Sequence, residues 1–244
     1  MRQSKLRLYC FSPPVMLVTF IIEIGLFLWV FGKWSAKSTA NRLVLAILFF
    51  LALFQLAEYN VCGRFNIDAL TWSRIGFVSI TMLPPLGMHL VYVLAGKKER
   101  VLAWLSYLMG AVFIYIFAFS SVAFNSHVCA GNYAIFQLNA DMHLGGMYFT
   151  YYYGWLFMAM AFAALYAKGV KKTQARALWY VIAGYCFFLI PTTVVNMVKP
   201  ETMSGIPSVM CGFAVTWALV LVFGILPAAK EISASAGKKT TKKK

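Results

Sequence analysis

Long apolar segments dominate the pattern of hydrophobic and polar positions along the chain. Seven of them, each about 20 residues long, alternate with short polar stretches. A helix needs about 20 mostly apolar residues to cross the hydrocarbon core of a bilayer. The pattern therefore predicts an all-α fold, a polytopic seven-transmembrane helix bundle. The expected spans are residues 14–32, 43–61, 74–95, 101–121, 147–167, 177–198 and 206–228.

The expected fifth span differs from the others because it begins with aromatic and polar residues, Met147 to Tyr153. Amphipathic rings favour the headgroup level of a bilayer. Tryptophans also fall at both expected membrane faces, with Trp72 and Trp155 at one and Trp34, Trp104 and Trp179 at the other. Two such aromatic belts are typical of a bundle that spans a membrane.

Composition supports a membrane protein and argues against a nucleic-acid-binding one. The 244 residues are 61% hydrophobic and only 12% charged, whereas soluble domains average about 25% charged residues. The formal net charge of +15 comes from short basic clusters between the apolar segments. Topology explains that placement better than a nucleic-acid groove does. The lipid bilayer is therefore the first expected partner, and no nucleic acid is expected.

The basic clusters also predict the orientation. One side of the bundle collects most of them, and the rule that basic loops stay inside makes this side cytoplasmic. Its residues are Lys33, Lys37, Arg42, Lys97, Lys98, Arg100, Lys168, Lys171, Lys172, Arg176 and the tail. An odd number of spans places the N-terminus outside, although Arg2, Lys5 and Arg7 oppose this. We expect an extracytoplasmic segment 1–13, a membrane domain 14–231 and a disordered basic tail 232–244, in a multi-pass protein of the plasma membrane.

Ionisable residues inside the spans are expensive and usually have a reason to be there. Glu23 lies near the middle of the first span and His89 in the inner half of the third. Glu58 lies about one turn from the outer end of the second span, level with Arg74. Arg74 has two candidate partners, Glu58 and Asp68. Glu23 is expected to face the bundle or to be protonated, and His89 to be a hydrogen-bonded packing residue.

The outer ends of the second, third and sixth spans offer a candidate ligand site. Its residues would be Glu58, Trp72, Arg74 and Asn196. The simpler alternative is a structural ion pair between Glu58 and Arg74 that has no ligand.

Prolines interrupt two of the expected spans. Pro84 and Pro85 lie in the third span and Pro191 in the sixth. Each removes an intrahelical hydrogen bond, and a kink is expected there. Such kinks serve either a two-state switch or a static bundle, and both interpretations remain open.

The long outer connection, 122–146, has no Lys or Arg and is expected to be a loop that caps the bundle. Cys62 and Cys129 both fall in outer connections and are candidates for a disulfide, with Cys10 as a competing partner. His127, Cys129, Asp141 and His143 have none of the spacings of a metal site, so no metal is expected.

No motif indicates catalysis. The chain has no nucleophile elbow, HExxH or P-loop, and its last span has no lysine that could hold retinal as a Schiff base. We expect neither an enzyme nor a cofactor.

Three stretches of the chain resemble one known family. The first is Trp72-Ser-Arg-Ile-Gly-Phe77 followed by Leu83-Pro-Pro-Leu86. The second comprises Gln174, Ala183-Gly184, Pro191 and Asn196. The third is Gly205-Ile-Pro-Ser-Val209 with the exit Phe223 to Glu231. Together, over about residues 40–231, they resemble the seven-transmembrane N-terminal sensor module of bacterial and archaeal histidine kinases and diguanylate cyclases.

That resemblance implies a receptor-like role, in which the helices sense an outside or membrane-embedded signal. The family's last helix leads into an output domain, whereas only about a dozen residues follow Glu231 here. A sensor role would therefore require a separate cytoplasmic signalling partner. The alternative is a scaffold or assembly subunit that recruits a partner or anionic lipid through its inner loops and basic tail. A small-solute transporter ranks third, because the ionisable groups are scattered along the sequence.

Overall fold

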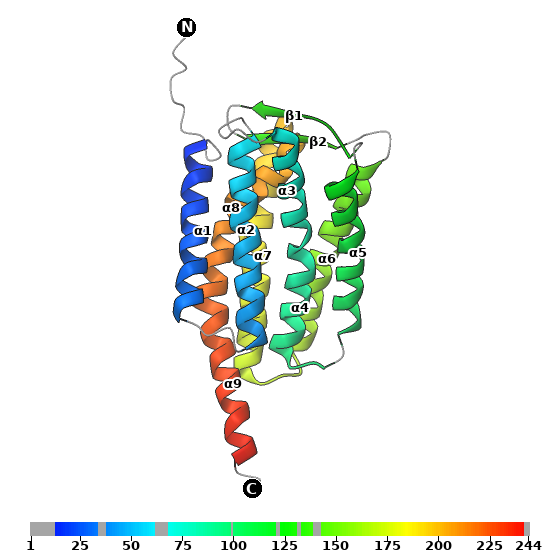
Figure 1. The fold of residues 1–244 in the computed structure, drawn as a ribbon. Helices are drawn as coiled ribbons and strands as arrows, with labels where there is room; N and C mark the ends of the chain where they lie inside the picture. The colour runs from blue at the N-terminus through cyan, green and yellow to red at the C-terminus, as the bar shows by residue number, and fades with distance from the viewer. Residues whose placement is uncertain are drawn as a thin grey trace.

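The structure is a computed structural model that describes residues 13–33, 38–61, 68–98, 100–120, 123–130, 133–138 and 143–241. Helices pack side by side as a bundle, with a β-hairpin across one end (Figure 1). The helices before the hairpin are α1 (Pro13–Lys33), α2 (Thr39–Val61), α3 (Ala69–Thr81), α4 (Leu83–Ala95) and α5 (Val101–Phe119). After it come α6 (Leu144–Ala167), α7 (Lys172–Val198), the 3-10 turn η1 (Pro200–Gly205), α8 (Ile206–Leu219), the π-helical turn η2 (Val220–Ile225) and α9 (Leu226–Thr241).

The described residues form seven helical columns, because some neighbouring elements continue one another. Helices α3 and α4 form one column interrupted at Met82, and α8, η2 and α9 form another. Six columns are long and apolar enough to cross a membrane, which supports the expectation of a multi-pass α-helical membrane protein. They cover Pro14–Lys33, Thr39–Val61, Ala69–Ala95, Val101–Phe119, Lys172–Val198 and Ile206–Ala234.

The remaining column is α6, whose 24 residues are long enough to span a bilayer but include several tyrosines. These rings face the bundle: Tyr148, Tyr151 and Tyr152 are all buried. The large apolar side chains Phe157 and Leu165 point outward instead. The polar character of α6 is therefore directed inward.

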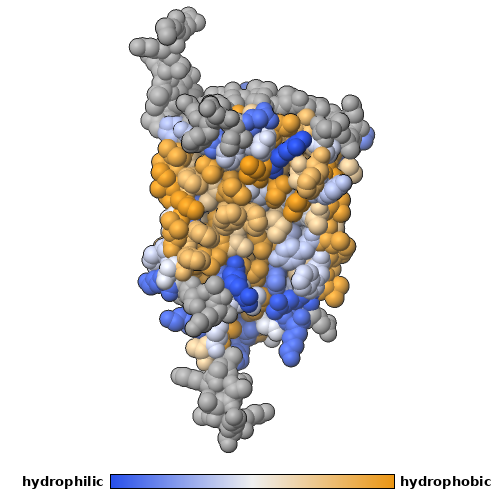
Figure 2. All heavy atoms as spheres, viewed as in Figure 1, coloured by the Kyte–Doolittle hydropathy of each residue, from blue (hydrophilic) through white to orange (hydrophobic). Residues whose placement is uncertain are grey.

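Apolar side chains cover most of the middle of the face shown in Figure 2, with polar residues gathered toward its two ends. We call the exposed apolar side chains along the middle of the helices the apolar belt. Exposed Ile21 of α1, Leu108 of α5 and Ile190 of α7 belong to this belt. A lipid environment accounts for such exposure, because a soluble surface with so large an apolar patch would aggregate. Basic residues begin or follow the helices at the end opposite the hairpin: Lys97, Lys98, Arg100, Lys168, Lys171, Lys172 and Arg176.

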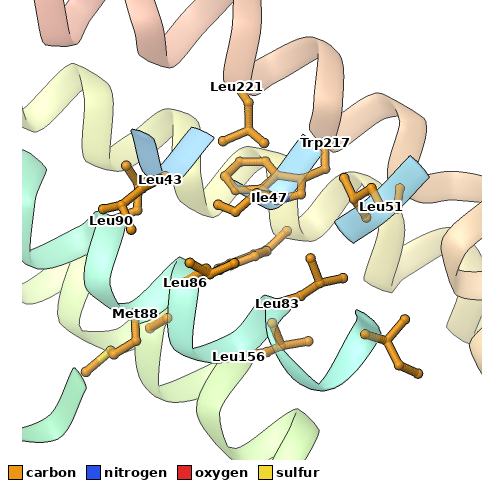
Figure 3. Close-up of a cluster of buried hydrophobic side chains, with 14 of the residues drawn as sticks. Leu43, Ile47, Leu51, Leu83, Leu86, Met88, Leu90, Leu156, Trp217 and Leu221 are labelled. Atoms are coloured by element: carbon orange, nitrogen blue, oxygen red, sulfur yellow. The ribbon is translucent and has the colours of Figure 1, made fainter. Parts of the chain in front are cut away.

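Aliphatic and aromatic side chains from four columns fill the core (Figure 3). Leu43, Ile47 and Leu51 of α2 meet Leu83 and Leu86 of α4, together with Leu156, Trp217 and Leu221. Gly184 of α7 allows the Trp217 ring to pack directly against the backbone, since a Cβ there would collide with the ring. Small residues permit close helix approach in a membrane, where the hydrophobic effect does not drive helices together.

Two segments differ from what the sequence pattern predicts. Within the connection expected as a loop, β1 (Phe124–Ala130) pairs antiparallel with β2 (Tyr133–Leu138). The hairpin contacts α3, η1 and α8, and so it does cap the bundle. The tail was expected to be disordered from residue 232, but α9 continues to Thr241. A helix already formed in the bundle needs no new nucleus, so it can continue one residue at a time into the tail.

Candidate functional site

Two glutamates from neighbouring helices are buried inside the bundle. Glu23 of α1 and Glu58 of α2 have exposed fractions of 0% and 1%, and their carboxyl groups interact electrostatically. Ser208 of α8 donates a hydrogen bond to the Glu58 carboxyl group. Both carboxyl oxygens of Glu23 and Oε1 of Glu58 are buried without a hydrogen-bond partner. We call Glu23, Glu58 and Ser208 the carboxyl pair site.

Helix periodicity explains why Glu23 points inward. The buried residues of α1 are Met16, Thr19, Glu23 and Val30, a spacing of three, four and seven that forms one narrow stripe. The rest of α1 is largely exposed, as expected for a peripheral helix in contact with lipid. The expectation that Glu23 faces the bundle is confirmed.

A second polar contact fixes the other side of the site. Gln55 lies one turn before Glu58, on the same face of α2, and its Nε2 donates to the Cys211 carbonyl oxygen over 2.8 Å. Ser208 and Cys211 are likewise one turn apart in α8. The two helices are thus joined by two polar contacts, one of which involves Glu58.

The predicted ion pair of Arg74 with Glu58 or Asp68 is wrong. Arg74 Nη2 instead donates to the Ser120 carbonyl oxygen at the end of α5, over 3.3 Å. Among the described residues, the salt bridge in the structure joins Arg176 to Glu231 and does not involve Arg74. The reason is rotational: Glu58 lies on the face of α2 that meets α1 and α8, whereas Arg74 reaches α5.

The other two ligand candidates also lie apart from the carboxyl pair site. Trp72 is buried, and its Nε1 has no hydrogen-bond partner. Asn196 accepts a hydrogen bond from the Thr202 hydroxyl over 2.7 Å, at the turn between α7 and η1. A ligand-binding role for Glu58, Trp72, Arg74 and Asn196 as one pocket stays a prediction.

The proline pair of the third column produces the break between α3 and α4. Pro85 has no N–H to offer the Thr81 carbonyl oxygen. The Tyr151 hydroxyl of α6 donates to that oxygen instead, over 2.8 Å. The Thr81 hydroxyl donates to the Phe77 carbonyl oxygen and lies 3.1 Å from the Tyr148 hydroxyl. We call Thr81, Pro85, Tyr148 and Tyr151 the tyrosine joint.

Helix α5 completes the tyrosine joint through a glycine. A Cβ at Gly110 would lie 2.7 Å from the Tyr151 hydroxyl and 3.4 Å from Pro85 Cγ. The joint therefore connects three columns around one freed carbonyl group. The high tyrosine content of the expected fifth span was the sequence signal for it, but tyrosines at the N-terminal end of a span also suit a membrane interface.

Pro191 behaves differently from the proline pair, because α7 continues through it without interruption. The following threonines bond back along the same helix. Thr192 donates to the Phe188 carbonyl oxygen and Thr193 to that of Leu189. The carbonyl group that Pro191 leaves without its usual donor is that of Phe187, so neither threonine replaces the lost bond.

His89 of α4 lies near the opposite end of the bundle. Arg100 Nη1 donates to His89 Nε2 over 2.8 Å, and His89 Nδ1 lies 3.3 Å from the Tyr107 hydroxyl. Arginine cannot accept a hydrogen bond, so Nε2 must be the acceptor and the ring is a neutral Nδ1–H tautomer. Hydrogen-bonded packing was the interpretation expected for His89, and these contacts agree with it.

The predicted disulfide lies outside the described residues, since neither Cys62 nor the side chain of Cys129 is described. Cys10 lies outside as well. Cys186 and Cys211 are free thiols. Across the part of the chain that the structure describes, no cluster of three or more His, Cys, Asp or Glu residues could hold a metal ion.

A wide groove of about 780 Å³ separates α5 from α6 on the surface of the bundle. Its lining is mostly apolar and includes Leu105, Met109, Met147 and Met158. The groove opens toward the apolar belt, so lipid would fill it in a membrane.

Comparison with protein-family profiles and with curated protein sequences finds no match to this chain.

Proposed function

We propose that the chain is a seven-span protein of the plasma membrane, with its N-terminus outside, that acts as a receptor-like module. It senses an extracytoplasmic or membrane-embedded signal and passes it to a separate cytoplasmic partner. The resemblance to the sensor modules of histidine kinases and diguanylate cyclases motivates this proposal. The tyrosine joint is the observation that carries it.

The tyrosine joint gives one column two halves that can move separately. In an intact helix the backbone hydrogen bonds couple both halves rigidly. Here the Thr81 carbonyl oxygen depends on the Tyr151 hydroxyl of another column. A shift of α6 relative to α3 would therefore change the angle at Met82 and displace the α4 end that carries His89 and Arg100. Two-state elements of this kind are what transmit a signal across a bundle.

Affinity capture of the tagged full chain from native membranes tests the proposal. A cytoplasmic kinase or cyclase should be enriched relative to capture with an unrelated tagged membrane protein. Its recovery should change at least about threefold with Gly110→Val, which displaces the joint, and stay unchanged with Met147→Ala on the lipid-facing surface. Enrichment of a non-signalling complex that is indifferent to Gly110→Val would contradict the receptor role.

A scaffold role is the second candidate, because α9 continues beyond the rest of the bundle (Figure 1). A salt bridge of 2.7 Å between Arg176 of α7 and Glu231 joins the first part of α9 to the bundle. Lys238 and Lys239 lie in this helix, and each lysine near an anionic membrane surface contributes about 1 kcal/mol of attraction. Deleting 238–244 should weaken binding to anionic liposomes and to a partner; unchanged binding of both would reject this role.

A further inference from the structure

We propose that the carboxyl pair site binds one small monovalent cation, either a proton or Na⁺. Glu23 and Glu58 would share it, with the Ser208 hydroxyl as a third oxygen. This site goes beyond the receptor role, because cation binding is a property of the isolated protein and needs no partner.

The first step is electrostatic. Two carboxyl groups that are buried together cannot both carry a negative charge unless a positive charge compensates them. No basic side chain is recorded as a hydrogen-bond or salt-bridge partner of either glutamate within the described ranges. The groups recorded around them are the Ser208 hydroxyl and the Cys211 thiol of α8, and neither carries a positive charge. The compensating charge must therefore come from solution.

The second step concerns the unused oxygens. Buried polar atoms almost always have a hydrogen-bond partner, and those that lack one call for an explanation. Three of the four carboxyl oxygens of the pair lack a partner although their side chains are 0% and 1% exposed. They come from two different helices and belong to groups that interact with each other. Oxygen atoms in this arrangement are suitable ligands for a hard monovalent cation or a shared proton.

The third step concerns access and orientation. Glu58 lies three residues before the end of α2 and Ser208 two residues after the start of α8, both at the hairpin end. Glu58 and Ser208 therefore lie about one helical turn from that end, whereas Glu23 lies deeper, near the middle of α1. Gln55 is held by the Cys211 carbonyl oxygen, which keeps its amide away from the carboxyl groups. No internal donor therefore occupies the three unpartnered carboxyl oxygens, and they remain available to a cation.

This proximity also changes one expectation from the sequence. A transporter ranked last because the ionisable residues are scattered along the chain, but the fold brings Glu23 and Glu58 together across 35 positions. A cation site alone does not make a transporter. It does supply a ligand that a sensor or a transporter could use.

Thermal unfolding of the purified full chain in detergent tests the Na⁺ alternative. NaCl is compared with N-methylglucamine chloride at equal ionic strength and pH 8. Saturating Na⁺ should raise the Tm by about 5 °C. Glu23→Gln and Glu58→Gln should abolish that shift, and Glu201→Gln, an exposed carboxylate on η1, should leave it intact.

Infrared difference spectroscopy of the same samples tests the proton alternative. A protonated carboxyl band should disappear reversibly as the pH rises from 5 to 9 and should lose intensity in Glu23→Gln. Either a sodium shift or a titrating band supports the site and tells the two cations apart. Absence of both in the wild-type chain would overturn the proposal, a result that does not depend on whether the variants fold. A partner found by capture would still support the receptor role in that case.

Discussion

The carboxyl pair site and the tyrosine joint are two polar clusters in one apolar bundle, and they differ in how well their hydrogen bonds are satisfied. At the joint, the Thr81 carbonyl oxygen has no N–H partner at Pro85 and accepts a hydrogen bond from the Tyr151 hydroxyl instead. At the pair site, three carboxyl oxygens have no partner. Buried polar groups that all have partners define one arrangement of their helices, whereas buried polar atoms without partners call for an explanation such as a bound ion. This difference is why we propose a mechanical role for the first cluster and a binding role for the second.

The largest expected effect comes from overfilling the joint. Gly110→Val places a side chain where the Tyr151 hydroxyl lies, and overpacking of this kind destabilises by about 3 kcal/mol. Thermal unfolding in detergent should show a clearly lower Tm. Gly154→Val is the matched control, because a Cβ at Gly154 meets nothing within 4 Å. Equal losses in both variants would mean that α5, α6 and Pro85 do not meet as described.

A change of opposite sign is expected at the carboxyl pair site. Glu23→Gln removes a buried carboxyl group without a partner, and in Na⁺-free buffer at pH 8 it should stabilise the bundle by about 2 kcal/mol. Urea or thermal unfolding measures this. A destabilised variant that is correctly inserted would show that Glu23 makes a favourable internal contact, and the contrast between the two clusters would be lost.

The smallest effect is expected from removing a single hydroxyl group. Tyr151→Phe leaves the Thr81 carbonyl oxygen unpaired and should cost about 1 kcal/mol. Tyr115→Phe serves as the control, because Tyr115 is exposed on α5. Indistinguishable Tm values for these two variants would argue that water or another donor satisfies the joint.

Much of the fold could be predicted from hydropathy, since each column follows an apolar segment and proline marks the break at Met82. The partners of the polar side chains could not be predicted. Glu58 and Arg74 occupy the same level of neighbouring spans, yet Glu58 faces α8 and Arg74 reaches Ser120. The depth of a residue along the bundle follows from its position in the sequence. The direction in which its side chain points depends on how its helix is rotated about its own axis.

The pairing of Glu23 with Glu58 was missed for the same reason. A charged residue in the first span indicates a buried position, and the stripe of Met16, Thr19 and Val30 shows which face it belongs to. The sequence around Glu23 does not indicate which neighbouring helix packs against that face of α1. The hairpin was missed because its Asn and Gly residues resemble a loop, and pairing between strands is a non-local property.

The proposed seven-span bundle is tested most directly by asking whether α6 crosses the membrane despite its tyrosines. Single cysteines at His143 and Gly169, which flank α6, are introduced into a chain without other cysteines and labelled with a membrane-impermeant maleimide in intact cells. Seven spans predict that His143→Cys is labelled from outside and Gly169→Cys only after permeabilisation. Labelling of both positions from the same side would contradict a seven-span bundle with inward-facing tyrosines.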